Sequence, residues 1–576
     1  MNKMNSTTWI LPPVKEEARN LSAGLGIPLG IAQIMARRNI SDLETAYKFL
    51  FGTLNDLHDP YLLDGMEKAV TRIRKAISFG ENILVFGDYD VDGILSVVIL
   101  SEALGSLGAK VDYYIPDRMK DGYGIKEKYV DIALKRKSTL AISVDCGIKA
   151  IGFVKRAKKC GIDVIITDHH QPGGMLPESL AVLNPVIRSS GYPDKDLAGI
   201  GVVFKLIQAL FKEAGKSSAI THYIKFVSMG TIADVAALRG ENRLFIKFGL
   251  KSLERDLNNG LKCLMKVCGL EGKKISVGDV GFRIGPRINA AGRMGKADLA
   301  VELFFSDNFQ KSTEIACQLD RLNLQRQKVE ERIYSQAIEY IKKKSLDKKY
   351  KLLILGCDEW HRGVIGIVAS KLKDFFNRPV ILFAYEDGKA FGSGRSISEF
   401  SLIECIDKNR EFFLSFGGHP MAVGCELDKK NIGSLKEAVN DFVSSKILEE
   451  HLRKKIYIDT IINFNEINSA FLENMSFLSP FGVGNSKPVF LSKYVQVVDE
   501  PKRIKRRHSK FLVKQGDIFF EALGWGRGEW IEDIQKGDRI DIVYSLQFSE
   551  YLGQERLNLS LRDIRKSNSS VCVNTK

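Results

Sequence analysis

The chain has 576 residues, 44% of them hydrophobic and 27% charged, which predicts three or four globular domains. With 85 Lys and Arg against 70 Asp and Glu, the formal net charge is +15, which suggests a polyanionic partner; charge alone fits a basic protein with no nucleic-acid role equally well. The nine cysteines include no Cys-x-x-Cys pair, which argues against a zinc cluster and a disulfide framework.

Residues 1–70 are expected to form an N-terminal segment ahead of the first α/β domain. The first twenty residues lack the apolar core of a secretory signal. No run of about 18 apolar residues, the length of a membrane span, occurs in the sequence. We therefore expect a cytoplasmic protein with reduced cysteines and no membrane partner.

Residues 71–235 alternate short apolar runs with amphipathic segments. Strands are predicted around residues 83–87, 140–144 and 163–167, with helices between them. This alternation predicts a parallel sheet, in which ligands bind beyond the carboxyl ends of the strands. Polar side chains follow each strand at that edge: Asp88, Asp90, Asp92, Asp145, Asp168, His169 and His170.

Carboxylates and imidazoles at neighbouring strand ends suit divalent cations such as Mn²⁺ and Mg²⁺. A single Asp at such a place is more simply explained as a helix cap or a turn residue. Without cations, however, gathering several carboxylates beside a histidine pair would be costly. Because successive strands all end in potential ligands, a cation site is the better interpretation.

Residues 236–348 are predicted to be mostly helical, with a long charged helix that connects to a second α/β unit at residues 349–453. In that unit, residues 392–396 (GSGRS) and 417–420 (GGHP) combine small residues with one Arg or His. This composition suits close approach of the backbone to phosphate oxygens, and a pair of surface turns is the alternative.

Residues 454–566 change to period-two strands with turns, which predicts a small β-barrel of the OB-fold type. Residues 501–511 (PKRIKRRHSKF) hold six Lys and Arg and no acid. They predict either a solvated strand and turn or a phosphate-binding surface, with Trp525 or Phe511 as candidate stacking partners. Residues 567–576 are expected to be a disordered tail.

Four motifs, in this order along the chain, resemble those of the DHH phosphoesterases: DYDVDG (88–93), VDCG (144–147), TDHH (167–170) and ADVAALRGENR (233–243). Downstream segments are similar to the DHHA1 domain and to the single-strand-specific DNA exonucleases of this superfamily: residues 282–295, 361–372, 392–396 and 416–424. The resemblance runs from about Trp9 to Ile564. It implies an α/β multidomain fold with a parallel-sheet DHH domain, a long connecting helix, a DHHA1 domain and a C-terminal OB-fold.

The resemblance also implies residue roles. Two divalent cations, Mn²⁺ or Mg²⁺, would be held by five metal ligands: Asp90, Asp92, Asp145 (bridging both), His169 and Asp234. His170 would face the scissile phosphate, Asp88 would be an auxiliary ligand, and Asp168 would orient the histidines. Many relatives carry a His ligand where this chain has Phe86, so we expect the first cation to bind more weakly.

The substrate would be held by the DHHA1 part of the chain. The resemblance implies that Ser393, Arg395 and His419 contact the nucleotide. Further candidates along the same phosphate track are Arg287, Arg293, His361 and Arg362, since a guanidinium matches phosphate well.

The implied activity is hydrolysis of single-stranded DNA from the 5′ end to mononucleotides, with two cations activating a water, in DNA repair and recombination. A helicase and a single-strand-binding protein are the candidate partners of an expected monomer. One alternative is a phosphodiesterase of short oligonucleotides or cyclic dinucleotides, whose members are typically shorter and lack the barrel. Another is a non-catalytic single-strand-binding scaffold. An esterase or NTPase interpretation is weakened because neither a Gly-x-Ser-x-Gly elbow nor a P-loop is evident.

Overall fold

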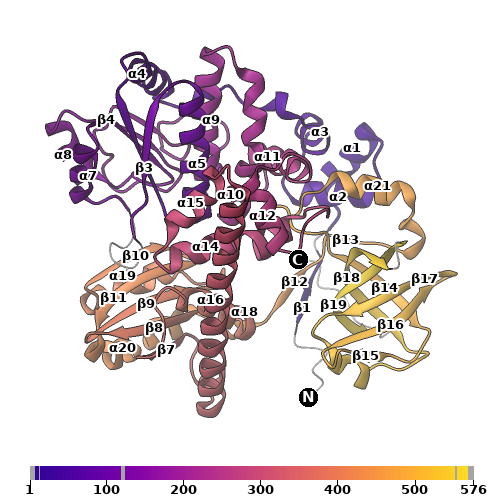
Figure 1. The fold of residues 1–576 in the computed structure, drawn as a ribbon. Coiled ribbons are helices and arrows are strands. Elements are labelled where there is room, and N and C mark those ends of the chain that lie inside the picture. Colours follow the sequence, from indigo (N-terminus) through magenta and orange to yellow (C-terminus); the bar gives the residue numbers. More distant parts are fainter. Residues whose placement is uncertain (1–6, 12, 118–123, 552–553, 568–576) are drawn as a thin grey trace. The chain divides into compact units, whose positions relative to one another are not determined.

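The computed structural model describes residues 7–11, 13–117, 124–551 and 554–567 (Figure 1). The chain forms two compact units, one of residues 53–446 and one that combines residues 1–52 with residues 447–576. Within the described residues, no helix has both the length and the apolar character needed to cross a bilayer.

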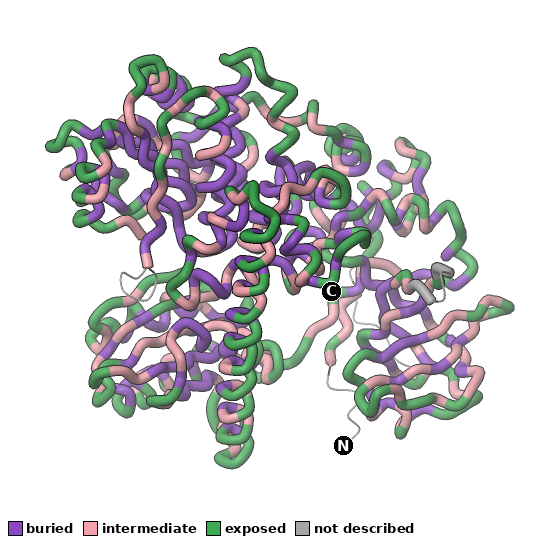
Figure 2. Tube along the Cα trace, in the orientation of Figure 1, coloured by how far each residue is buried: buried purple, intermediate pink, exposed green. Residues whose placement is uncertain are grey.

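The larger unit begins with a parallel five-stranded sheet in the order β3-β2-β4-β5-β6. Its strands are β2 (Asn82–Gly87), β3 (Lys110–Tyr114), β4 (Ser138–Val144), β5 (Asp163–Thr167) and β6 (Ala181–Leu183). Helix α5 (Val91–Ser106) follows β2 and is buried over nearly its whole length, as is α9 (Gly199–Glu213) (Figure 2). The predicted parallel sheet is confirmed, and β2, β4 and β5 lie side by side with their carboxyl ends at one edge.

Helices fill the middle of the larger unit. They include α4 (Met66–Ser78) and α8 (Ile151–Lys159) beside the sheet, then α10 (Ile224–Ala233), α11 (Gly240–Ser252), α12 (Asn259–Val267), α14 (Gly285–Arg293) and α15 (Ala297–Phe305). The 36-residue α16 (Phe309–Lys344) connects two cores. Its Ile315 and Leu319 belong to the core around the parallel sheet, whereas Ile333 and Ile341 pack into the core of the next domain.

That next domain has a mixed sheet in the order β10-β11-β9-β8-β7. Strands β7 (Leu353–Cys357) and β8 (Val380–Glu386) are parallel, and β9 (Lys389–Arg395), β11 (Ala422–Asp428) and β10 (Ser415–His419) continue antiparallel. Helix α18 (Ile365–Phe376) packs against β8 and β9, while α19 (Leu402–Lys408) and α20 (Ile432–Lys446) complete the domain.

The smaller unit contains the predicted barrel. Strands β14 (Phe490–Val497), β18 (Arg539–Tyr551), β19 (Gln554–Lys566), β17 (Ile518–Gly524) and β16 (His508–Gln515) pair in this order, and pairing of β16 with β14 closes the ring. The N-terminal helices α1 (Glu16–Leu25), α2 (Leu29–Arg37) and α3 (Leu43–Phe51) share the barrel's hydrophobic cluster, and β1 (Thr8–Ile10) pairs with β12 (Lys455–Tyr457). The predicted α/β multidomain fold with a C-terminal OB-type barrel is therefore confirmed.

Within the barrel, Phe511 is only 1% exposed and belongs to the core, so it offers no face to a nucleotide base. Trp525 is 48% exposed and lies 5.0 Å from the His508 ring, between centroids. Of the two candidate stacking partners, only Trp525 is placed for contact with a ligand. The predicted tail falls, from residue 568 onward, outside the described residues.

Candidate metal centre and phosphate site

The polar residues that follow β2, β4 and β5 meet at the carboxyl edge of the sheet, and Asp234 joins them from the end of α10. Side-chain ligand atoms lie within 4.8 Å of one another in three groups: Asp88 with Asp90 and Asp145; Asp92 with His169 and Asp234; and Asp145 with His169 and His170. These groups bring together all the residues predicted at this edge except Asp168, which lies directly behind the histidines.

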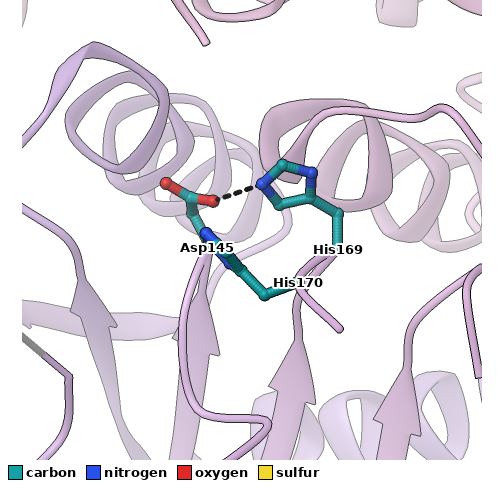
Figure 3. Close-up of side chains that lie close together, drawn as sticks. All are labelled: Asp145, His169 and His170. Carbon is teal, nitrogen blue, oxygen red and sulfur yellow. Dashed lines mark ion pairs between the residues drawn. The ribbon is translucent and has the colours of Figure 1, made fainter. Parts of the chain in front are cut away.

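Asp145 and His169 form the centre of this cluster (Figure 3). His169 Nε2 lies 3.2 Å from Asp145 Oδ1, and its Nδ1 lies 3.9 Å from Asp234 Oδ2. Both Asp145 Oδ1 and His169 Nε2 are buried without a hydrogen-bond partner among the described residues. Such buried orphan atoms are costly, and a carboxylate facing an imidazole lone pair is a donor set that fits a divalent cation.

The protonation state of His169 suits this role. Burial, followed by the neighbouring His170, lowers the pKa of His169 to about 4. The ring is therefore neutral at pH 7 and offers a lone pair rather than a charge.

The carboxylates repel one another. Burial, and then the charge of Asp90, raises the pKa of Asp92 to about 7. The pKa of Asp145 is raised well above its ordinary value by burial and by Asp92, Asp90, Asp88 and Asp234, and burial followed by Asp92 and Asp90 does the same for the pKa of Asp234. Bound cations would relieve this repulsion, because positive charge favours the ionised carboxylates.

The backbone at the cluster is unusual. Asp145 has a φ of 58° and Val235, directly after Asp234, has a φ of 65°, both in the left-handed region that side chains avoid. A Cβ on Gly199 would collide with the Asp145 carboxylate, so only glycine fits there. Strain and close packing of this kind concentrate at functional sites.

Asp92 and Asp88 differ in their surroundings. Both carboxylate oxygens of Asp92 accept backbone N–H groups at the start of α9, Oδ2 from Gly199 and Oδ1 from Ile200, each at 2.8 Å. Asp88, by contrast, stands with Asp90 and Asp145 in a group that contains oxygen ligands only. Asp88 and Asp90 thus fall in the same group of potential ligand atoms, together with Asp145.

Asp168 fixes the histidine pair. Its Oδ1 accepts from the backbone N–H groups of His169 and His170 and lies 2.7 Å from His170 Nδ1, while Oδ2 accepts from Ile148 N. Burial alone would raise the pKa of Asp168, but the contact with His170 outweighs it and lowers that pKa. Burial likewise disfavours a charged His170, yet Asp168 outweighs it and raises the pKa of His170.

Phe86 lies in an aromatic cluster on the sheet. It is fully buried, with its ring centroid 5.2 Å from Phe153, 6.0 Å from Tyr114 and 6.5 Å from Tyr129. The position thus serves packing in this chain and supplies no imidazole.

On the DHHA1 side, Ser393 and Arg395 lie at the end of β9. Arg395 Nη1 donates to Ser393 Oγ at 3.3 Å, and a Cβ on Gly366 would be 2.8 Å from Ser393 Oγ and 3.4 Å from Arg395 Nη2. Both side chains therefore lie against the first turn of α18. His419 is exposed at the end of β10, two strands from β9.

The four weaker phosphate candidates are engaged with the protein itself. Arg287 pairs with Asp320 at 2.8 Å and donates to Arg283 O; Arg293 Nη1 donates to Gly363 O at 2.8 Å; His361 Nδ1 accepts from Gly363 N; and Arg362 lies over the Phe391 ring. Arg293 and His361 both contact Gly363, which directly follows Arg362, whereas Arg287 pairs with Asp320 on α16.

Two residues that the sequence did not single out support the site. Asn184 Nδ2 donates to His170 O at 3.0 Å, and Asn289 Oδ1 accepts from Val91 N at 3.2 Å, directly after Asp90. Asn184 follows β6 at the same sheet edge, a position that could have marked it. For Asn289, 198 residues from its partner, local sequence carries no signal.

Comparison with family models defines the class of protein. Residues 82–231 match the DHH family N-terminal domain, residues 349–445 match the DHHA1 domain, and residues 458–563 match the RecJ OB domain. The chain is thus a DHH phosphoesterase-type protein that carries an additional OB domain.

Individual relatives narrow this class to one family. The single-stranded-DNA-specific exonuclease RecJ of Bacillus subtilis is 36% identical over 96% of this chain and 70% of the relative, and that of Haemophilus influenzae is 32% identical over 89% and 92%. The crystal structure of RecJ from Thermus thermophilus in complex with Mn²⁺ superposes with a TM-score of 0.84 at 29% identity, covering 99% of this chain and 81% of that one. The chain belongs to the RecJ family.

Proposed function

We propose that this protein is a cation-dependent exonuclease that hydrolyses single-stranded DNA from the 5′ end to mononucleotides, in DNA repair and recombination. The observation that carries the proposal is the buried pair of orphan ligand atoms, Asp145 Oδ1 and His169 Nε2, inside a cluster of carboxylates. We assign catalysis to residues 71–235, phosphate binding to residues 349–453 and strand binding to residues 454–566.

The ligand groups fit two Mn²⁺ or Mg²⁺ ions. Asp88, Asp90 and Asp145 would hold one, and Asp92, His169 and Asp234 would hold the other; Asp145, which is also grouped with His169, would be shared by both. When bound, such a pair of cations supplies an activated water at neutral pH and neutralises charge on the phosphate. Asp92 also accepts two backbone N–H groups at the start of α9, which would fix the position of the ligand groups relative to that helix.

His170 would act on the phosphate. Its raised pKa, caused by Asp168, favours the protonated ring, which can donate to a phosphate oxygen. Asp168 holds His170 Nδ1 at 2.7 Å, so Nε2 is the nitrogen left to face the substrate. Asp168 is thus a positioning residue and His170 a catalytic one.

The 5′-terminal phosphate would be bound by Ser393 and Arg395 with the first turn of α18, and His419 would contact the same nucleotide. A guanidinium matches the geometry of a phosphate group, and a serine hydroxyl can donate to one of its oxygens. Binding the terminal phosphate at a fixed place sets the direction of cleavage. Arg287, Arg293, His361 and Arg362 are assigned, from their present contacts, to supporting this region.

The barrel would bind the strand beyond the site. Its residues 501–511 carry six basic side chains, and Trp525 lies exposed near His508. We further propose that the protein is a cytoplasmic monomer whose partners include a helicase and a single-strand-binding protein.

The two alternatives are less well supported. A phosphodiesterase of dinucleotides or cyclic dinucleotides has no need of a basic barrel. A non-catalytic scaffold has no need of an orphaned ligand pair whose burial is costly without a cation.

The test uses oligonucleotides labelled at either end, single-stranded or blunt duplex, with Mn²⁺ or EDTA, and compares the wild type with Asp145→Ala. We expect Mn²⁺-dependent release of mononucleotides from the 5′ end of single strands only, and none from the variant. Cleavage restricted to dinucleotides would support the short-substrate phosphodiesterase. Tight binding of single strands without cleavage in Mn²⁺ would support the scaffold. An oligonucleotide without a 5′-phosphate should lose affinity for the wild type but much less for Arg395→Ala, which has already lost that contact.

A further inference from the structure

Helix α14 lies against the segment that carries Asp88 and Asp90. Three of its residues, Gly285, Asn289 and Gly292, are spaced by four and three positions and so share one face of the helix. All three face residues of the metal-binding segments. A Cβ on Gly285 would be 3.7 Å from Ala233 Cβ and 4.0 Å from Val91 Cγ2, which are neighbours of Asp234 and Asp90.

The two other residues of this face hold the peptide groups on either side of Asp90. Asn289 Oδ1 accepts from Val91 N at 3.2 Å, which engages the peptide that follows Asp90. On the other side, the Tyr89 carbonyl lies so close to Gly292 that a Cβ there would collide with its oxygen. Glycine is unfavourable inside a helix relative to alanine, so this close approach explains the presence of Gly292.

The neighbouring contacts transmit this placement to the ligands. Tyr89 N donates to Asp88 Oδ1 at 2.8 Å, and Asp90 Oδ1 accepts from Gly93 N at 3.1 Å at the start of α5. Moving the 89–91 peptides would therefore move both carboxylates.

We infer that Asn289 and Gly292 are positioning residues for the cation held by Asp88, Asp90 and Asp145, and that α14 acts as the template for that half of the metal centre. The inference rests on the proposed function for the presence of the cation. Residues that orient metal ligands from behind typically affect metal affinity by about 10- to 100-fold when replaced. Neither residue touches the cation or the substrate.

The face ends beside a contact with the DHHA1 domain. Arg293, the next residue, donates from Nη1 to Gly363 O at 2.8 Å, in the loop that leads into α18. The C-terminal end of α14 thus contacts the Tyr89 carbonyl through Gly292 and the phosphate-side loop through Arg293. Displacement of α14 should therefore change cation binding and turnover more than strand binding, which we assign to the barrel.

The experiment measures Mn²⁺ binding by calorimetry and the Mn²⁺ concentration that gives half-maximal cleavage, for four variants of the full chain. Asn289→Ala removes the acceptor and Gly292→Ala drives a methyl group against Tyr89. The controls are Gly281→Ala, where a Cβ would meet only Ile232 at 3.8 Å, and Asn259→Ala, which removes an amide of α12 that donates to Asp307 O. Thermal unfolding of each variant in EDTA verifies that it is folded.

We expect Asn289→Ala and Gly292→Ala to bind the Mn²⁺ assigned to Asp88, Asp90 and Asp145 about tenfold or more weakly. Their kcat should be reduced at a fixed subsaturating Mn²⁺ concentration, and their KM for DNA should change little. Both controls should match the wild type. Wild-type Mn²⁺ affinity in a folded Asn289→Ala and a folded Gly292→Ala would overturn the inference. If Gly292→Ala fails to fold, Asn289→Ala alone decides. If the wild type itself neither binds Mn²⁺ nor cleaves DNA, the proposed function fails instead.

Discussion

The carboxylate of Asp92 caps the first turn of α9 by accepting from Gly199 N at 2.8 Å, and its second oxygen accepts from Ile200 N at the same distance. Asp92 is 1% exposed, and Gly199 lies so close to Asp145 that it admits no side chain. One carboxylate thereby ties the α5 segment to α9 and sets the distance between two strand ends. Asp92, the third aspartate of the DYDVDG motif, therefore has a structural role as well as the proposed role of a metal ligand.

This arrangement predicts different costs for neighbouring aspartates. In the metal-free protein, Asp92→Ala and Asp90→Ala both remove the repulsion between these two carboxylates. Asp92→Ala also leaves two buried N–H groups without an acceptor, whereas Asp90→Ala loses one N-cap contact to Gly93, so Asp92→Ala should be the less stable variant by about 1 kcal/mol or more. Asp90→Ala should still abolish binding of one cation. Urea unfolding in EDTA and calorimetric Mn²⁺ titration measure the two effects. Equal loss of stability in both variants would contradict the structural role of Asp92.

The imidazole of His169 among the carboxylates of the ligand cluster predicts a difference between cations. Oxygen ligands suit Mg²⁺ and Mn²⁺ alike, whereas an imidazole favours the softer transition metal. His169→Asp should therefore reduce the preference for Mn²⁺ over Mg²⁺, measured as the ratio of their dissociation constants by calorimetry. His222→Ala, which removes an exposed imidazole that pairs with Glu102, is the control. An unchanged ratio in His169→Asp would mean that this ring does not bind the cation.

A buried aspartate away from the ligand cluster predicts a pH effect on stability. Burial raises the pKa of Asp194, and it outweighs the backbone hydrogen bonds from Glu241 and Asp196. Because its pKa in the folded state lies above the unfolded value, the folded state holds the proton longer, and stability falls as pH rises above about 4. Asp194→Asn lacks this loss.

The measurable quantity is the difference in unfolding free energy between Asp194→Asn and the wild type in EDTA. From about pH 4 upward, this difference should shift in favour of the variant by at most about 1.4 kcal/mol per pH unit, until the folded-state pKa is passed. Any fixed cost of the amide leaves this slope unchanged. A difference that stays constant, or shifts toward the wild type, would show that the pKa of Asp194 is not raised.

Local sequence was enough for the strands and for the residues that follow them. The apolar runs of β2, β4 and β5 end in acids or histidines, and parallel pairing alone brings those ends together. The same period-two rule would also have placed Phe511 inside the barrel, since Ser509 and Val513 on the same strand are buried beside it. Phe511 became a candidate stacking partner because basic residues surround it in sequence, although its side chain lies on the buried face of β16.

Long-range packing could not be predicted in the same way. Helices α1 to α3 share a core with a barrel that lies at the other end of the chain, and Asn289 meets Val91 across 198 residues. The sequence of an amphipathic helix predicts that it has an apolar face, but it does not predict which apolar surface will cover that face. The capping of α9 by Asp92 likewise depends on how α5 and α9 pack together, which local sequence does not determine.

The basic strand of the barrel predicts how binding depends on salt. Residues Lys502, Lys505 and Arg507 are exposed around β15 (Lys502–Ile504) and the turn into β16, whereas Arg503 and Lys510 pair with Glu532 and Glu521. If Lys502, Lys505 and Arg507, three of the exposed cations of this segment, each neutralise one phosphate, their replacement by Gln should weaken single-strand binding and flatten the slope of log affinity against log salt by about 2. Fluorescence anisotropy in EDTA, between about 50 and 200 mM salt, measures the slope.

The matched control replaces three other lysines of the same unit. Lys48, Lys487 and Lys536 are exposed, so changing them to Gln removes equal charge and should leave the slope nearly unchanged. Equal flattening in both triple variants would mean that net charge, and not this strand, attracts the DNA.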